Sequence, residues 1–439
     1  AEDTSLPRRR SLRGMLAYAT QQARQSPMLN PSTQEDRNAR LLYLNTAMVG
    51  VATGGIAAFL PVFLARLGAS PALMGWLNSA PSLLLVFLLI PGAVIAERHA
   101  DQVAVRVRYA RILRSAYLVC ALAPFVVPAA YLPVALLVIW TLTVVPEAVA
   151  QPSWTAVLAN AVSPRRRATV NSVRWALLAV VSAAASAFFG WLLDYVAFPY
   201  NYQAVFFLSW AFSWADPYFF SFIRIPPIAV ARAEVAADFS RRRSLWRRFR
   251  DHMRPVLGCR PFWVFLAATL PYRLALNLPS PLFSLFWVNE LEAPDTLIGL
   301  RGTVGHGVLV AGYLVWGRLA NRIGHRAVLM GSAGILALYP VATALSPSAA
   351  WLLPAAAIWG FAVAGVDIGL FDLMLAACPG ERQPLFAAVW TMAARAAMFV
   401  GPLIGAALSE ATSLGTALLV GGVAQGVTIL FFLVLPRDV

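Results

Sequence analysis

The feature that most constrains this chain is a series of windows of about 20 predominantly apolar residues, which recur from residue 42 to the C-terminus. Short polar breaks separate the windows. Strands of a membrane barrel would instead alternate over about 10 residues, so the windows predict helices that cross a bilayer. Hydrophobic residues make up 59% of the chain and charged residues only 13%. Water-soluble domains have fewer apolar and more charged residues, so this composition favours a membrane protein.

The windows predict an all-α polytopic membrane protein with twelve transmembrane helices. We expect these helices at residues 42–67, 72–96, 109–128, 132–151, 170–193, 204–223, 262–288, 297–320, 327–345, 351–377, 385–408 and 414–435. The chain then divides into an N-terminal tail (1–40), a first six-helix bundle (41–223), a basic linker (224–260) and a second six-helix bundle (261–439).

The charges are distributed unevenly between the two sets of breaks. All 35 basic residues are arginines, and they gather in the tails, the linker and every second break. The remaining breaks carry mainly acids, namely Asp194, Glu290, Glu292, Asp295 and Glu410. This positive-inside distribution predicts a multi-pass protein of the cell (inner) membrane with both termini and the linker in the cytoplasm. Its basic face would contact anionic lipids rather than nucleic acid.

The two halves of the chain also repeat. Pro71 and Gly75 before the second window are echoed by Pro294 and Gly299 before the eighth. A second set of matches shares one offset: Pro164, Arg167, Trp175 and Gly190 correspond to Pro379, Arg382, Trp390 and Gly405. Internal repeats of this kind are typical of membrane transporters.

One break carries a recognisable motif, Gly317-Arg-Leu-Ala-Asn321-Arg322-Ile-Gly324-His-Arg326. It resembles the signature loop of the major facilitator superfamily, Gly-x-Leu-Ala-Asp-Arg-x-Gly-Arg-Arg, with Asn321 in place of the Asp. The equivalent break in the first half contains Glu97 and Arg98 and is a weaker match. The resemblance covers roughly residues 40–437 and implies two pseudo-symmetric six-helix bundles.

The resemblance also implies a gating latch, because in this family the motif holds the cytoplasmic side closed in the outward-open state. A generic positive-inside turn is the simpler alternative. Glu147 follows Pro146 near the cytoplasmic end of the fourth window, and we expect it to pair with Arg98 in this latch. The predicted latch residues are Glu97, Arg98, Glu147, Gly317, Asn321, Arg322, Gly324 and Arg326.

Ionisable side chains inside the membrane are costly and indicate function. In the family, helices 1, 4, 7 and 10 line a central cavity, and Arg273 and Asp367 fall on two of them. The window around Arg273 contains three prolines, which is tolerated where backbone lines a cavity. Arg273 would bind an anionic group or neutralise Asp367, and Asp367 would carry a coupling proton or remain paired. The predicted substrate or coupling-ion site is Arg273, Asp367, Tyr272, Asn277 and Arg395.

These features imply a secondary transporter of a small organic solute that works by alternating access. Proton-coupled symport, antiport and uniport all fit. No catalytic constellation, phosphate-binding loop, cofactor motif or metal motif emerges, so we predict neither an enzyme nor a bound cofactor or metal. The alternative is a non-transporting accessory subunit, assembly factor, or pigment or lipid carrier of a membrane complex with other subunits. Such a protein would fill the cavity with Phe283, Phe286 and Phe371.

Overall fold

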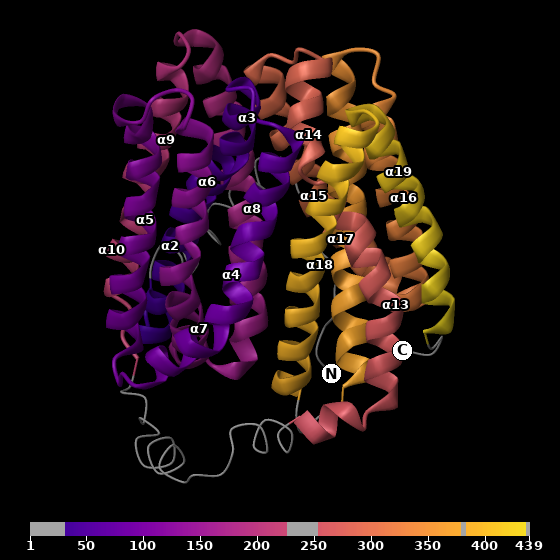
Figure 1. The fold of residues 1–439 in the computed structure, drawn as a ribbon. Coiled ribbons are helices and arrows are strands. Elements are labelled where there is room, and N and C mark those ends of the chain that lie inside the picture. Colours follow the sequence, from indigo (N-terminus) through magenta and orange to yellow (C-terminus); the bar gives the residue numbers. More distant parts are fainter. Residues whose placement is uncertain (1–30, 226–252, 379–382, 436–439) are drawn as a thin grey trace, which may run out of the picture.

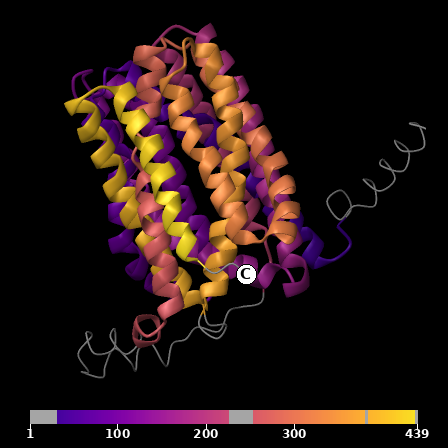
Figure 2. The ribbon, with the colours of Figure 1, turned by 90° about the vertical axis from the view of Figure 1, so that its right-hand side faces the viewer.

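The computed structural model describes residues 31–225, 253–378 and 383–435. Within these ranges the secondary structure is helical, with no strand. Figure 1 shows the helices in two bundles that stand side by side, and Figure 2 shows that they run nearly parallel to one another. The predicted tail (1–40) and linker (224–260) lie largely outside the described residues.

The first bundle contains α2 (Gln34–Ala52), η1 (Thr53–Ala57), α3 (Ala58–Arg66), α4 (Pro71–Glu97), α5 (Gln102–Val126), α6 (Leu132–Leu142), α7 (Val144–Ala161), α8 (Pro164–Tyr195), α9 (Tyr200–Ser213) and α10 (Ala215–Ser221). The second contains α13 (Arg260–Asn277), α14 (Leu282–Leu285), η2 (Phe286–Glu290), α15 (Asp295–Ile323), α16 (His325–Ala344), η3 (Ala349–Trp351), α17 (Leu352–Ala377), α18 (Gln383–Ala411), α19 (Leu414–Thr428) and η5 (Ile429–Val434).

Ten of the described helical segments are long and apolar enough to cross a membrane. Two further segments, α9–α10 and α13–α14, complete the two bundles at the places where the sixth and seventh helices are predicted. Both are interrupted. Pro271 is accommodated inside α13, and the helix ends at Asn277, just before Pro279 and Pro281, because proline cannot continue the hydrogen-bond ladder.

Several helices begin or end beyond their predicted bounds because of capping groups. At the start of α2, the Thr33 side chain accepts a hydrogen bond from the backbone N–H of Asp36, and the Asp36 carboxylate accepts one from the backbone of Thr33. This capping box starts the helix at Gln34, inside the stretch predicted as tail. Asp101 caps α5 in a similar way through the N–H of Ala104, so this helix begins at Gln102.

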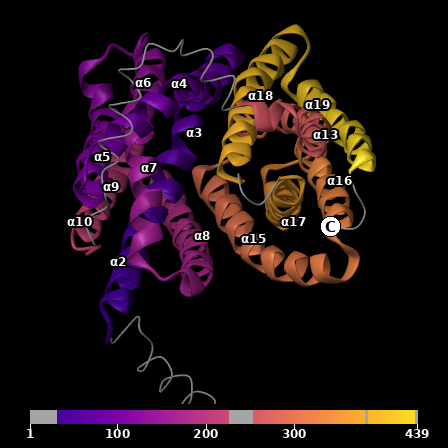
Figure 3. The ribbon, with the colours of Figure 1, turned by 90° about the horizontal axis from the view of Figure 1, so that it is seen from below.

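The two ends of the molecule are distinct. We call the end where α10 finishes and α13 starts the linker side, and the end where α3 finishes and α15 starts the opposite side (Figure 1). Between the bundles, α8 packs against α15 and α4 packs against α18. Figure 3, viewed from below, shows both pairs along the boundary between the bundles.

The repeated glycines allow these helices to come close. A Cβ atom on Gly299 of α15 would lie 2.3 Å from the Ser186 carbonyl oxygen of α8, and one on Gly75 of α4 would lie 2.9 Å from the Ala406 Cβ of α18. Close packing of small residues is a general device of membrane helices. The match between Gly75 and Gly299 in the sequence therefore marks the two equivalent contacts between the bundles.

We expect Gly299→Ala to lower stability by about 1–3 kcal/mol, because the added methyl group must push α15 away from α8. Gly307→Ala in the same helix is the matched control, since a Cβ atom there meets nothing within 4 Å. Alanine favours helix at Gly307 and should leave stability unchanged or slightly higher. Melting temperatures in one detergent check this. Equal melting of the two variants would contradict it.

Candidate functional site

Polar contacts between the bundles lie on the opposite side. Arg66 at the end of α3 forms an ion pair with Asp295 at the start of α15, at 3.2 Å, and also donates to the Ala293 carbonyl. The Tyr202 hydroxyl of α9 donates to the same Asp295 carboxylate at 2.8 Å. In return, the Asp194 carboxylate accepts the backbone N–H groups of Asp295 and Thr296, each at 3.0 Å. Both bundles thus supply charges to a single network.

A second seam joins α4 to α18. Glu410 accepts the backbone N–H of Ala72 at 3.1 Å, where α4 has unsatisfied N–H groups, and the Ser79 hydroxyl donates to the Phe399 carbonyl at 2.7 Å. Within the described ranges, every hydrogen bond between the bundles belongs to one of these two seams or to the neighbouring contacts of α8 with Thr296 and Thr303.

The apolar core has the same asymmetry. One cluster of buried side chains draws on both bundles, and it lies toward the opposite side; it includes Phe59, Phe63, Leu64, Leu285, Phe286 and Trp287. The remaining clusters of described residues each belong to one bundle alone. The described residues therefore join the bundles on the opposite side, and on the linker side no hydrogen bond or buried apolar cluster among them does so.

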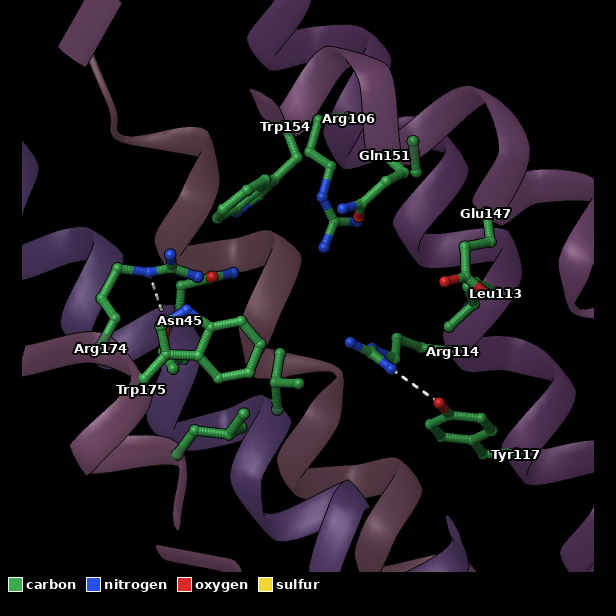
Figure 4. Close-up of a pocket in the computed structure, with 14 residues that line it drawn as sticks. Asn45, Arg106, Leu113, Arg114, Tyr117, Glu147, Gln151, Trp154, Arg174 and Trp175 are labelled. Atoms are coloured by element: carbon green, nitrogen blue, oxygen red, sulfur yellow. Dashed lines mark hydrogen bonds between the residues drawn. The ribbon is translucent and has the colours of Figure 1, made fainter. Parts of the chain in front are cut away.

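The first bundle contains a cavity of about 320 Å³ between α2, α5, α7 and α8. Figure 4 shows three guanidinium groups, those of Arg106, Arg114 and Arg174, pointing into it. The other lining residues are Asn45, Thr46, Val49, Leu113, Tyr117, Glu147, Ala150, Gln151, Trp154, Trp175 and Leu178. Glu147, Gln151 and Trp175 are exposed, so protein does not cover the whole cavity.

A buried ion pair lies behind this cavity. The Asp216 side chain of α10 is fully buried and accepts hydrogen bonds from Nε and Nη2 of Arg114, at 3.1 and 2.7 Å. Asn45 also donates to this carboxylate, and Arg106 Nη2 lies 3.6 Å away. Arg114 in turn donates to the Tyr117 hydroxyl at 2.8 Å. Paired and hydrogen-bonded in this way, a buried charge is tolerated.

The other two arginines have fewer partners. Arg174 donates to Thr46 and Asn171, at 2.9 and 3.0 Å, and its guanidinium lies 4.5 Å from the Trp154 ring centroid. The Nε atom of Arg106 is buried and has no hydrogen-bond partner in the described residues. Neither arginine has a carboxylate of its own.

In the second bundle, the two predicted charges Arg273 and Asp367 lie near one another. The Arg273 guanidinium stacks 4.4 Å from the Trp390 ring centroid, and its Nε atom has no partner among the described residues. Asp367 accepts a hydrogen bond from the Tyr313 hydroxyl at 2.9 Å. Arg273 and Asp367 lie within Coulombic range but form no direct ion pair.

The other three predicted residues have different surroundings. Tyr272 is fully buried against Phe432, with ring centroids 5.2 Å apart. Asn277 donates to the carbonyl of Arg273 one helical turn earlier, at 2.7 Å. Arg395 is partly exposed and makes no hydrogen bond or ion pair with the described part of the chain.

The predicted latch residues, apart from Glu147, lie on the linker side and form no hydrogen bond or ion pair with the described part of the other bundle. Glu97, Arg98 and Arg322 are exposed, and Asn321 donates to the Gly317 carbonyl of its own helix at 3.2 Å. Arg326 donates to the Leu433 and Leu435 carbonyls. Gly324 has a φ of 83°, which glycine adopts without strain.

Glu147 lies in the first-bundle cavity rather than beside Arg98. The sequence suggested a helix ending at residue 151, with Glu147 near its cytoplasmic end. In the structure α7 continues to Ala161, which places Glu147 about four turns from that end. The expected ion pair between Glu147 and Arg98 is absent from the described contacts.

Sequence reasoning missed Arg106 and Arg114 as members of a site. The predicted third helix began at residue 109, so Arg106 was assigned to a polar break, whereas α5 begins at Gln102. Asp216 lies inside the sixth predicted helix, residues 204–223. It is fully buried, and its partners come from α2 and α5 of the same bundle.

Comparisons with known proteins agree with this architecture. The family model of the Major Facilitator Superfamily matches residues 265–439. A curated relative, the MFS thioclapurine efflux transporter of Claviceps purpurea (strain 20.1), is 27% identical over 128 residues. That match covers 28% of this chain and only 24% of the relative's length.

Solved structures cover far more of the chain. A POT family transporter in complex with 5-aminolevulinic acid superposes with a TM-score of 0.67 at 11% identity, over 91% of this chain and 96% of that one. A bacterial homologue of the iron transporter ferroportin in an inward-facing state superposes with a TM-score of 0.67 at 16% identity. The superposition covers 90% of this chain and 98% of that one. A bacterial homologue of the human lysosomal transporter Spinster, inward-facing and unoccupied, superposes with a TM-score of 0.63 at 15% identity. The superposition covers 92% of this chain and 95% of that one. Likeness at such identities shows the fold.

The family and the fold class predicted from the motif and the apolar windows are thus confirmed. The sequence match rests on the second bundle and the structural match extends over both. The chain is a multi-pass membrane protein whose second bundle matches the family model of the Major Facilitator Superfamily and whose two bundles share the fold of these solved transporters.

Proposed function

We propose that this protein is a secondary transporter, in which the two bundles rock about a central site so that a small organic solute reaches each side of the membrane in turn. The observation that carries the proposal is the placement of the contacts between the bundles. Among the described residues, the hydrogen bonds, the ion pair and the shared apolar cluster that join the bundles all lie away from the linker side.

Alternating access needs two states of similar free energy, each closed on a different side. The state described here is closed by the Arg66–Asp295 pair and the α4–α18 seam. The second state would break these contacts and form new ones on the linker side. Glu97, Arg98 and Arg322 are exposed there and available for such contacts. The arginine distribution supports a cytoplasmic linker side, which makes the present state inward-open in the cell membrane.

Two of the three aromatic side chains that would plug the cavity of a non-transporting subunit, Phe283 and Phe286, pack in or beside the core on the opposite side. Phe286 is buried in the core cluster on the opposite side, and Phe283 packs at its edge against Tyr339, with ring centroids 4.5 Å apart. Phe371 is 53% exposed. This arrangement favours a transporter over an accessory subunit or carrier. Asp367 and Glu147 are the carboxylates best placed to carry a coupling proton.

Distances between spin labels test the proposal. One pair, Asn160→Cys with Ala376→Cys, spans the bundles on the linker side, and a control pair, Ala130→Cys with Ser348→Cys, spans them on the opposite side. Cys120, Cys259 and Cys378 are first replaced. In lipid nanodiscs we expect two populations for each pair, the linker-side distance shortening as the opposite distance lengthens. If each pair showed only one population of distances, and neither changed with pH or membrane composition, the proposal would be wrong.

A further inference from the structure

The side chains around the first-bundle cavity carry more positive than negative charge. Three guanidinium groups face it, from Arg106, Arg114 and Arg174, and two carboxylates, those of Asp216 and Glu147, oppose them. Counting formal charges, one positive charge remains. An unbalanced charge at membrane depth is costly and usually marks a functional site.

The buried pair accounts for only one of the three arginines. Asp216 takes two hydrogen bonds from Arg114, so these two residues neutralise one another. Glu147 is exposed, forms no ion pair with the described residues, and lies within Coulombic range of Arg106. Arg106 shares Asp216 only at 3.6 Å, and its Nε atom has no partner. That Nε atom is buried, but the terminal nitrogens of the Arg106 guanidinium line the cavity and form no hydrogen bond with the described residues, so they are available for a ligand.

The apolar part of the cavity wall is aromatic. Trp154 lies beneath the Arg174 guanidinium, and Trp175, which is 60% exposed, borders the same space (Figure 4). Stacking on Trp154 holds the Arg174 fork in place with its donors toward the cavity. A volume of about 320 Å³ suits a small solute.

From these observations we propose that the cavity binds an organic monoanion through its carboxylate. Arg106 and Arg174 donate to the carboxylate oxygens, and the flat apolar part of the solute lies against Trp154 and Trp175. Arginine forks match carboxylates in geometry, and one surplus positive charge is balanced by one negative charge. Glu147 limits the affinity by repelling the anion, which favours release. This inference rests on the proposed transport function and names its substrate class.

Calorimetric titration of the protein in nanodiscs tests the class of ligand. The probes are benzoate, indole-3-acetate and octanoate, each beside its neutral amide. We expect at least one carboxylate to bind. Its neutral amide should bind with an affinity lower by a factor of roughly ten or more, since a hydrogen bond to a charged group contributes about 1.5–3 kcal/mol. Equal binding of acid and amide, or no binding of any of the three acids, would overturn the proposal.

Variants then locate the site. Arg106→Gln and Arg174→Gln should each weaken binding of the carboxylate roughly tenfold, and Glu147→Gln should strengthen it. Arg111→Gln is the matched control: it lies in α5 like Arg106 but is exposed and does not line this cavity. Unchanged binding in Arg106→Gln and Arg174→Gln, with both variants folded, would place the anion elsewhere and overturn the proposal. The spin-label distances are read without any solute, so they judge the transport mechanism separately.

Discussion

Replacing Arg114 by alanine is expected to destabilise the protein by about 3–5 kcal/mol, the range found when one partner of a buried ion pair is removed. The Asp216 carboxylate has no exposed surface, and Arg114 supplies two of its hydrogen bonds. In the variant, Asn45 and the more distant Arg106 would be its main remaining partners. The measurement is the temperature at which half of the detergent-solubilised protein loses its monodisperse elution peak.

Two comparisons separate this effect from a general loss of charge. Arg111→Ala removes an exposed arginine from the same helix and should melt within a few degrees of the parent. The double variant Arg114→Met with Asp216→Leu removes both charges and should recover most of the loss, because apolar replacements of a buried pair are often neutral or stabilising. If Arg114→Ala melted like Arg111→Ala, the pair would not be holding α5 to α10.

The architecture could be predicted from the sequence because membrane helices satisfy their backbone hydrogen bonds locally. Length and apolarity alone therefore reveal them. The windows predicted at residues 72–96 and 297–320 show this, since each lies within one continuous helix, α4 or α15. The repeat that links Gly75 to Gly299 was visible in the sequence, but only the structure shows that both glycines lie at contacts between the bundles.

The candidate site was harder to predict, because it depends on where helices begin and on which side chains meet. Asp101 extends α5 back to Gln102, which moves Arg106 from a loop into a helix. The partners Arg114 and Asp216 are 102 positions apart, and no spacing rule connects them. Hydropathy could not give the depth of Glu147 either, because the polar stretch after residue 151 continues α7 rather than ending it.

The second large effect is expected at the contact that closes the opposite side. Asp295→Ala removes the acceptor for Arg66 and for Tyr202, and both of these donors belong to the other bundle. If each lost interaction contributes about 1.5 kcal/mol to this state, the ratio of inward-open to outward-open protein falls by roughly two orders of magnitude. The spin-label pair at positions 130 and 348 should then report mainly the longer distance, and the pair at 160 and 376 the shorter one.

Glu290→Ala provides the matched control, since it removes an exposed acid five residues away that forms no hydrogen bond or ion pair with the described part of the first bundle. It should leave both distance distributions as in the parent. Arg66→Ala should shift them in the same direction as Asp295→Ala but less far, because Tyr202 keeps its bond to Asp295. Combining the two changes should add little to Asp295→Ala alone, since residues in one network are not additive. Distances unchanged in Asp295→Ala would mean that the apolar cluster around Phe63 and Trp287, rather than the charges, holds this side closed.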